Sequence, residues 1–325
     1  MSRYSILAVC TFSLSAMAAA PSSYTIVDLG PDQQPMGANK YGVAVGYTIS
    51  SHVPVEYQNG IWARLAGTGT GFAYGINSNG TVVGWNGQQV EWKNGKRKQL
   101  AGTGRGAPEA ISDDGTIVGN HWGGSYDSCY SWKQGVKSYV PGLDGGDCYA
   151  YSIDRTGTYI GGKDISPNFD IDYEGFVMGP AGTAGIGALG GSFATSIVHA
   201  VNRHGHAAGQ STFDETYENA AVYWNGTQLI DIGLHPPGSG SVATAINSSD
   251  DVLVLGSDGA GHVLFLYSGR TGTTAAIEPL ISNPAGWAFD YSQGYMAAAL
   301  TDDGSIFGAA HFNGELHAFR LVPAH

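Results

Sequence analysis

The segment from Ala73 to Trp85 places short apolar runs on either side of a polar turn. Ile76 ends the first run, and Thr81 begins a second run that is rich in β-branched side chains, which favour strands. Residues 77–80 between them end in a glycine, which adopts positive φ at little steric cost. The pattern predicts a β-hairpin.

Near copies of this hairpin recur along the whole chain. Their predicted turns occupy residues 39–42, 77–80, 112–115, 154–157, 202–205, 247–250 and 301–304. Six turns end in glycine, and each of these is followed four residues later by a second glycine: Gly46, Gly84, Gly119, Gly161, Gly209 and Gly308. The copy at 247–250 lacks the turn glycine and reaches Gly256 late, which predicts a wider turn.

One position before each turn accepts only small side chains. It is occupied by Gly37, Gly75, Ala110, Ser152, Ala200, Ala245 and Ala299. The next residue is apolar in every copy. A position that is small seven times indicates crowded strands, as expected for the innermost strands around a central axis.

A second hairpin follows most of the first ones, with turns such as Asn59-Gly60 and Asn94-Gly95. Two hairpins make four strands, and the repeat period of 35 to 54 residues is that of a propeller blade. The sequence therefore predicts an all-β, seven-bladed β-propeller of four-stranded blades. The last unit is one strand short, so the strand Tyr24–Gly30 is expected to complete the seventh blade.

The unit also resembles a known bacterial extracellular repeat, the HAF family. The resemblance rests on the Leu-Gly-Gly-Ser lead at 189–192, the small-apolar-Asn hairpin at 200–205 and the literal His-Ala-Phe at 317–319. It covers essentially the whole chain after the leader and implies export and a propeller. It carries no agreed chemistry, and most blades replace His-Ala-Phe, so no catalytic residue follows from it.

The first residues are typical of a secretory signal peptide: Arg3, an apolar run and small residues before Ala18. We expect cleavage after residue 18, a single propeller domain over 19–325, and a soluble monomer that is secreted or periplasmic, without membrane insertion. The net charge of −12 argues against a nucleic-acid partner. Cys129 and Cys148 then form an even pair, which predicts a disulfide; a metal pair or a reactive thiol is the alternative.

Ligand sites in propellers usually lie in the loops that join strands two and three and in those between blades. The longest such loops belong to blades three, four and five. In blade three, His121 is a candidate general base and Trp122 a platform for a sugar ring, next to Tyr126 and Asp127. The disulfide is expected to hold this loop to Cys148, in the loop that leads to blade four. An ordinary surface loop stabilised by a disulfide is the alternative.

Blades four and five add acidic loops, with Asp170, Asp172 and Glu174 in one and Asp214, Glu215 and Glu218 in the other. Such clusters could bind Ca²⁺ or act as an acid and base pair, but an acidic loop is more often simply solvated, and no cofactor is expected otherwise. His311 is a candidate at the rim of blade seven. His199, His204 and His206 are assigned structural roles, with the last two expected to point apart and no metal bound.

The sequence contains no catalytic, phosphate-binding or dinucleotide motif. The first hypothesis is a secreted binding propeller for a glycan or cell-surface polymer, with Trp122, Asp127, Arg105, Asp214 and His311 as ligand-binding residues. The second is a lyase for acidic polysaccharides. There, His121, Tyr126, Tyr173 or Tyr217 would take a proton, and Lys163 or Arg105 would offset the uronate charge. The third is a structural or adhesive repeat protein.

Overall fold

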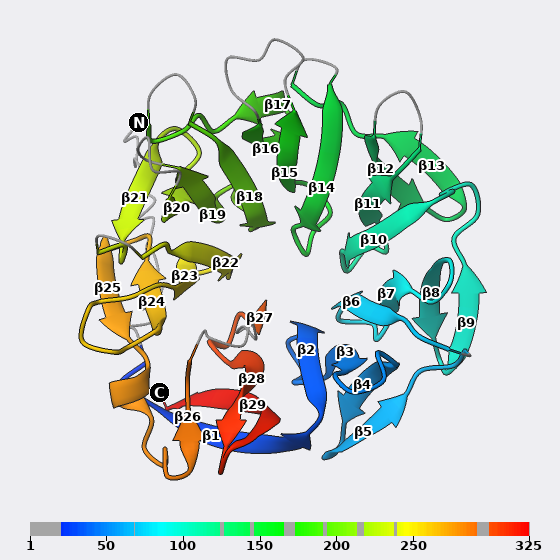
Figure 1. The fold of residues 1–325 in the computed structure, drawn as a ribbon. Coiled ribbons are helices and arrows are strands. Elements are labelled where there is room, and N and C mark those ends of the chain that lie inside the picture. The colour runs from blue at the N-terminus through cyan, green and yellow to red at the C-terminus, as the bar shows by residue number, and fades with distance from the viewer. Residues whose placement is uncertain are drawn as a thin grey trace, which may run out of the picture.

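The computed structural model describes residues 21–67, 69–123, 127–143, 146–165, 173–190, 194–212, 218–236, 239–290 and 299–324. These residues form seven antiparallel sheets arranged around a central axis (Figure 1). The predicted seven-bladed β-propeller is therefore confirmed. The predicted signal peptide lies outside the described residues, and no described helix has the length and apolar character needed to span a bilayer.

Six blades are formed by consecutive strands, from the axis outward. Blade one contains β2 (Gln33–Ala38), β3 (Ala44–Thr48), β4 (Pro54–Gln58) and β5 (Ile61–Arg64); blade two β6 (Phe72–Ile76), β7 (Val82–Trp85), β8 (Gln89–Lys93) and β9 (Lys96–Gln99); blade three β10 (Gly106–Ile111), β11 (Ile117–His121), β12 (Ser128–Lys133) and β13 (Val136–Tyr139). Blade four contains β14 (Asp147–Ile153), β15 (Ile160–Ile165), β16 (Glu174–Gly179) and β17 (Gly182–Gly185); blade five β18 (Ser196–Val201), β19 (Ala207–Thr212), β20 (Asn219–Trp224) and β21 (Leu229–Gly233); blade six β22 (Val242–Ile246), β23 (Asp251–Leu255), β24 (Leu264–Ser268) and β25 (Thr273–Ala276). A short 3₁₀ helix, η1 (Glu278–Leu280), follows blade six.

The seventh blade joins the two ends of the described chain. Its middle strands are β28 (Ile306–Phe312) and β29 (Glu315–Ala324), and β1 (Ser23–Pro31) pairs with β29 as the outer strand. The predicted N-terminal closing strand is thus confirmed. Its inner strand is divided, because β26 (Trp287–Ala288) and β27 (Ala299–Leu300) pair with opposite ends of β28.

The repeated asparagine explains why the first hairpins look alike. The Asn77 side-chain oxygen accepts hydrogen bonds from the backbone N–H groups of Asn79 and Thr81, at 3.0 and 2.9 Å, and so fixes the turn. Its amide group then donates to the backbone oxygen of Ser112, in the turn of the next blade, at 3.0 Å. Asn39 and Asn202 reach the following blades in the same way. The asparagine therefore both shapes a turn and links two blades.

The turn at 247–250 is not wider, which corrects the sequence prediction. Asp250 takes the place of the turn glycine and adopts a φ of 61°, close to the 69° of Gly80. Its N–H donates to the backbone oxygen of Asn247 at 3.2 Å, as the N–H of Gly80 does to Asn77 at 3.1 Å. Aspartate is one of the few residues that tolerate this conformation.

The second glycine of the repeat faces a β-bulge in the inner strand. A side chain at Gly84 would place its Cβ 2.0 Å from the backbone oxygen of Phe72, and Gly46 and Gly209 face the same obstacle. In blade four the equivalent residue is Gly162, not Gly161, because the turn there is one residue longer. In blade six it is Val254, not Gly256. The small residues beside the bulge touch the next inner strand, as predicted: a Cβ on Gly37 would lie 2.9 Å from the backbone oxygen of Tyr74.

The predicted disulfide joins Cys129 to Cys148, with their Cα atoms 5.1 Å apart. Both cysteines lie within strands, β12 and β14, and both are buried. The expectation that Cys148 belongs to a loop is therefore wrong. The bond connects the cores of blades three and four, below the loops that it was expected to hold.

Candidate functional site in the central channel

Each inner strand carries its β-bulge one residue before the small position. A bulge interrupts the alternation of side chains, and the unpaired residue turns away from its expected face. These residues are Met36, Tyr74, Glu109, Tyr151, His199 and Thr244 in blades one to six. All six line a cavity of about 430 Å³ on the propeller axis. Six side chains of five chemical kinds thus surround one channel.

Glu109 is the acidic member of this ring. The side-chain amide of Asn120 donates to Glu109 Oε1 at 3.2 Å. Burial nevertheless raises the pKa of Glu109 to about 7, with the Asn120 hydrogen bond opposing the shift. Burial, and then the nearby Glu109 charge, raise the pKa of the Tyr151 hydroxyl to about 12. At neutral pH the channel therefore holds a carboxyl group that is partly protonated beside a fully protonated phenol.

His199 is the basic member of the ring, and sequence reasoning assigned it only a structural role. Its Nε2 lies 3.3 Å from Gln210 Oε1, and its ring is 6.2 Å from that of Tyr151. Burial lowers the pKa of His199, and the positive charge of Lys163 acts in the same direction. The imidazole is therefore neutral at pH 7. When Nε2–H donates to Gln210, Nδ1 serves as an acceptor.

The upper mouth of the channel, at the end of the loops that join strands two and three, brings together three residues predicted from the sequence. Lys163 Nζ lies 4.4 Å from the ring centre of Tyr173 and 5.3 Å from that of Tyr149. The Tyr149 hydroxyl donates to Asp127 Oδ2 at 2.7 Å. Tyr149 also stacks on Tyr151, with ring centres 6.5 Å apart, which joins this group to the channel. We call Asp127, Tyr149, Lys163 and Tyr173 the upper-mouth group.

The other blade-three candidates lie beside this group, because the N–H of Gly123 donates to Asp127 Oδ1 at 3.3 Å. The backbone N–H of Trp122 donates to the backbone oxygen of Arg105 at 2.8 Å, and Trp122 is 45% exposed. The His121 ring packs against Gly104, in the segment that leads into β10. Among the described contacts, none joins His121, Trp122 or Arg105 directly to Lys163.

The remaining candidates are also dispersed. His311 lies in blade seven, with Nδ1 3.5 Å from Asp290 Oδ2. Tyr126, Asp214 and Tyr217 lie outside the described residues, as do Asp170 and Asp172. The rings of His204 and His206 are neighbours, 5.8 Å apart, so the expectation that they point apart is wrong. Among the described side chains, no group of three His, Cys, Asp or Glu is placed to hold a metal ion.

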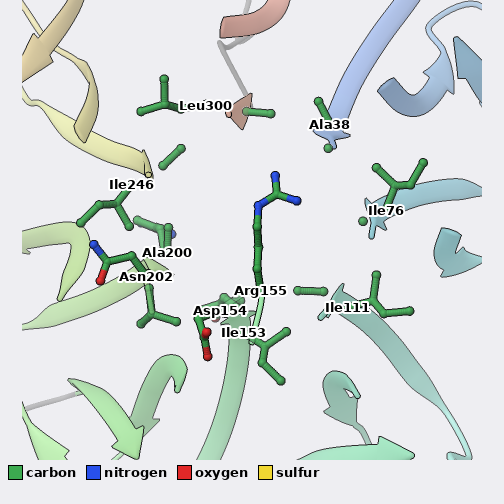
Figure 2. A pocket seen from close by; sticks show the side chains of 18 of the residues that line it. Ala38, Ile76, Ile111, Ile153, Asp154, Arg155, Ala200, Asn202, Ile246 and Leu300 are labelled. Atoms are coloured by element: carbon green, nitrogen blue, oxygen red, sulfur yellow. The ribbon is translucent and has the colours of Figure 1, made fainter. Parts of the chain in front are cut away.

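The lower mouth, at the end of the repeated turns, is crossed by one long side chain. Figure 2 shows Arg155 extending from blade four into the middle of a ring that includes Ile76, Ile111 and Leu300. Its Nε lies 3.6 Å from Asp302 Oδ2 in the turn of blade seven. This ion pair connects blades that are not neighbours and narrows the lower mouth, whereas the upper-mouth group lies toward the opposite end, on blades three and four.

Comparisons with known proteins identify a shared fold and assign no chemistry. No family model matches the chain, and no curated protein does. Among solved structures, YCF48 bound to D1 peptide has a TM-score of 0.55 at 12% identity, covering 96% of this chain and 100% of that one. A puromycin-hydrolysing peptidase from Mycobacterium tuberculosis has a TM-score of 0.53 at 13% identity; the match covers 92% of this chain and 51% of the peptidase, about half its length. Such distant similarity shows a shared propeller fold alone.

Proposed function

We propose that the protein is an exported propeller that binds a glycan at the upper mouth of its channel. The observation that carries the proposal is the upper-mouth group, in which Lys163 lies against two tyrosine rings above Tyr151 and His199. Aromatic rings offer apolar faces for sugar rings, and a few convergent polar groups fix the ligand's orientation. The channel below supplies such groups in Glu109 and His199.

Export is supported by the covalent bond between Cys129 and Cys148. Disulfides persist in oxidising compartments and are rare where thiols are kept reduced. A secreted or periplasmic location fits both this bond and the leader expected from the sequence.

Binding is favoured over catalysis because the tyrosines of the site are poor bases. Burial, and then the hydrogen bond to Asp127, raise the pKa of the Tyr149 hydroxyl well above its usual range. The Tyr151 hydroxyl, with a pKa of about 12, also keeps its proton at neutral pH. Both groups can donate hydrogen bonds to sugar oxygens, but neither readily accepts a proton.

A lyase is the second candidate, and His199 favours it. A neutral imidazole can take the proton from the carbon next to a uronate carboxyl. The electron pair left on that carbon forms a double bond to its neighbour, whose bond to the glycosidic oxygen breaks, and the departing oxygen takes a proton. Lys163, above His199, would offset the carboxylate charge.

The decisive experiment compares binding and product formation in the same samples. Wild type, Lys163→Met and Tyr173→Ala are applied to a glycan array and to an absorbance assay for unsaturated uronate. Lys40→Met and Tyr41→Ala are the matched controls, because Lys40 Nζ lies 5.2 Å from the Tyr41 ring at the turn face. The proposal expects wild-type binding to a glycan, loss in the two upper-mouth variants only, and no product.

Each other outcome has a clear meaning. Unsaturated product that disappears in His199→Gln would replace the binding function with the lyase. Equal loss in the control variants would remove the upper mouth as the site. Binding to no glycan would overturn the proposal in favour of the structural or adhesive alternative.

A further inference from the structure

The positive charges of this acidic protein are concentrated in one stretch of the chain. Of its 15 Lys and Arg residues, seven lie between residues 93 and 137: Lys93, Lys96, Arg97, Lys98, Arg105, Lys133 and Lys137. The same stretch has only four acids, one of which is Glu109 in the channel. Its net charge is +3, whereas the whole chain carries −12.

The fold turns this stretch into one continuous surface on the rims of blades two and three. Lys96 and Lys98 belong to the outer strand β9, and Lys137 belongs to the outer strand β13. Lys98 Nζ lies 5.5 Å from the ring centre of Trp132. This contact connects blade two to blade three. We call Lys93, Lys96, Lys98, Lys133 and Lys137, together with Tyr139, the basic rim.

Protection of exposed sheet edges does not explain the basic rim. Lysine on an edge strand discourages pairing with other chains, and every blade has such an edge. The outer strands β17 and β25 nevertheless contain no charged residue, and β21 contains only Asp231. If lysine served this purpose here, it would recur in these blades as well. Among the described outer strands, lysine occurs only in β9 and β13, on two neighbouring blades.

Part of the positive charge is free to bind a ligand. Lys98 Nζ lies 3.0 Å from Glu91 Oε1, and Lys133 Nζ lies 2.5 Å from Asp114 Oδ2, so acids offset these two. Lys93, Lys96 and Lys137 form no ion pair with any carboxylate in the described ranges. Unpaired cations at a surface attract polyanions at long range.

An exposed aromatic ring lies within the same surface. Tyr139 is 71% exposed at the end of β13, and Lys137 Nζ lies 5.2 Å from its ring centre. The same Nζ is 5.2 Å from the buried Tyr130 ring, which holds the lysine in place. A flat ring beside the ammonium group of Lys137 matches a polymer that presents apolar ring faces and carboxylates alternately.

We propose that the basic rim is a second carbohydrate site, which binds an acidic polysaccharide along blades two and three. Tyr139 stacks on a sugar ring, and Lys93, Lys96 and Lys137 contact carboxylates of neighbouring units. A polysaccharide is favoured over nucleic acid because the site offers only three unpaired lysines beside an exposed ring, whereas DNA carries one charge per about 3.4 Å of each strand and is bound through many clustered Lys and Arg. The site lies outside the channel and does not depend on the upper-mouth group.

The test compares two variants with the same net charge. In the rim variant, Lys93, Lys96 and Lys137 are changed to Gln; in the control variant, Lys40, Arg203 and Arg270, which lie in turns elsewhere, are changed to Gln. Affinity for polygalacturonate, neutral dextran and a single-stranded oligonucleotide is measured at low and physiological salt. Circular dichroism confirms that both variants fold, and Tyr139→Ala is tested in parallel.

The proposal expects wild type to bind polygalacturonate in preference to dextran and to the oligonucleotide. The rim variant should lose at least about tenfold in affinity, the control variant less than about twofold, and salt should weaken the binding. Tyr139→Ala should also weaken it, and Tyr173→Ala at the upper mouth should not. Absence of wild-type binding, equal losses in the two charge variants or preference for the oligonucleotide would each overturn the proposal.

Discussion

The two ends of the channel are made from the same strands but follow opposite rules. At the lower end, the turns repeat one hydrogen-bonding scheme, and Asn39, Asn77 and Asn202 each reach the next blade. At the upper end, Lys163, Tyr149 and Tyr173 occur together in blade four only. Repetition therefore marks the geometry that closes the ring, and departure from the repeat marks the chemistry. Substitutions at the two ends should therefore affect different properties.

The largest effect is expected at the repeated glycine. In Gly84→Ala the new Cβ would lie 2.0 Å from the backbone oxygen of Phe72, so the bulge of blade two would have to open. The bulge of blade six, opposite Val254, already accommodates a side chain, but the strands of blade two are fixed closer together. The free energy of unfolding should fall by more than about 3 kcal/mol, as measured by urea denaturation. Gly95→Ala is the control, because its Cβ meets no atom within 4 Å and only its φ of 70° opposes the change, at about 1 kcal/mol. Equal losses would refute the steric argument.

The repeated asparagine should be next in size. Asn77→Ala removes the acceptor for two backbone N–H groups and the donor to Ser112, for an expected loss of about 2 to 3 kcal/mol. Asn77→Asp keeps the acceptor and should lose less, because Asp154 fixes the turn of blade four in this way. Thermal unfolding of both variants would test the order, and a greater loss in the aspartate variant would contradict it.

A carboxyl group in the channel should make stability depend on pH. The pKa of Glu109 is about 7 in the folded chain against an ordinary value of 4.5, so the folded state holds the proton more tightly. Below pH 4.5 both states are protonated; stability is lost as pH rises to about 7 and stays low above it. Glu109→Gln should therefore match wild type at acidic pH and gain on the order of 3 kcal/mol at alkaline pH. A gain that does not vary with pH would contradict the assignment.

The smallest effect on stability is expected at the upper mouth. Tyr173 is half-buried and contacts Lys163 from the end of a strand, so Tyr173→Ala should cost less than about 1 kcal/mol. The same variant should lose glycan binding, which separates function from stability at this end of the channel. A loss of stability as large as that of Asn77→Ala would remove the distinction between the two ends.

The regular half of the fold could be predicted because it depends on local rules that recur. The fold requires a small residue at positions such as Gly75 and positive φ at turn glycines such as Gly80. These requirements recur in seven copies, so chance does not explain their pattern. The closing strand at Tyr24 follows from the strand that the last unit lacks. The prediction of a wider turn at Asp250 was wrong for a local reason. Aspartate can adopt positive φ, and the structure uses that ability where the other copies use glycine.

The site was harder to predict, because a bulge hides it. Strict alternation leaves no place for Glu109 or His199 at the axis, whereas the unpaired residue of a bulge turns toward it. A signal was available in the aligned copies: the residue before the small position changes from methionine to tyrosine, glutamate and histidine. The contact of Lys163 with Tyr149 depends on the register of β15 against β14, which spacing alone does not give.

The pairing of β1 with β29 also sets an order of events. Asp28 Oδ1 lies 2.9 Å from Nδ1 of His317, which is 289 residues further along the chain. Six blades can form as the polypeptide emerges, but the seventh must wait for its last strand, and the buried face of Tyr24 stays exposed until then. Contacts of such high sequence separation form slowly. The seventh blade can therefore close only after β29 has been made, and an unfinished chain keeps an open sheet edge that other chains could occupy.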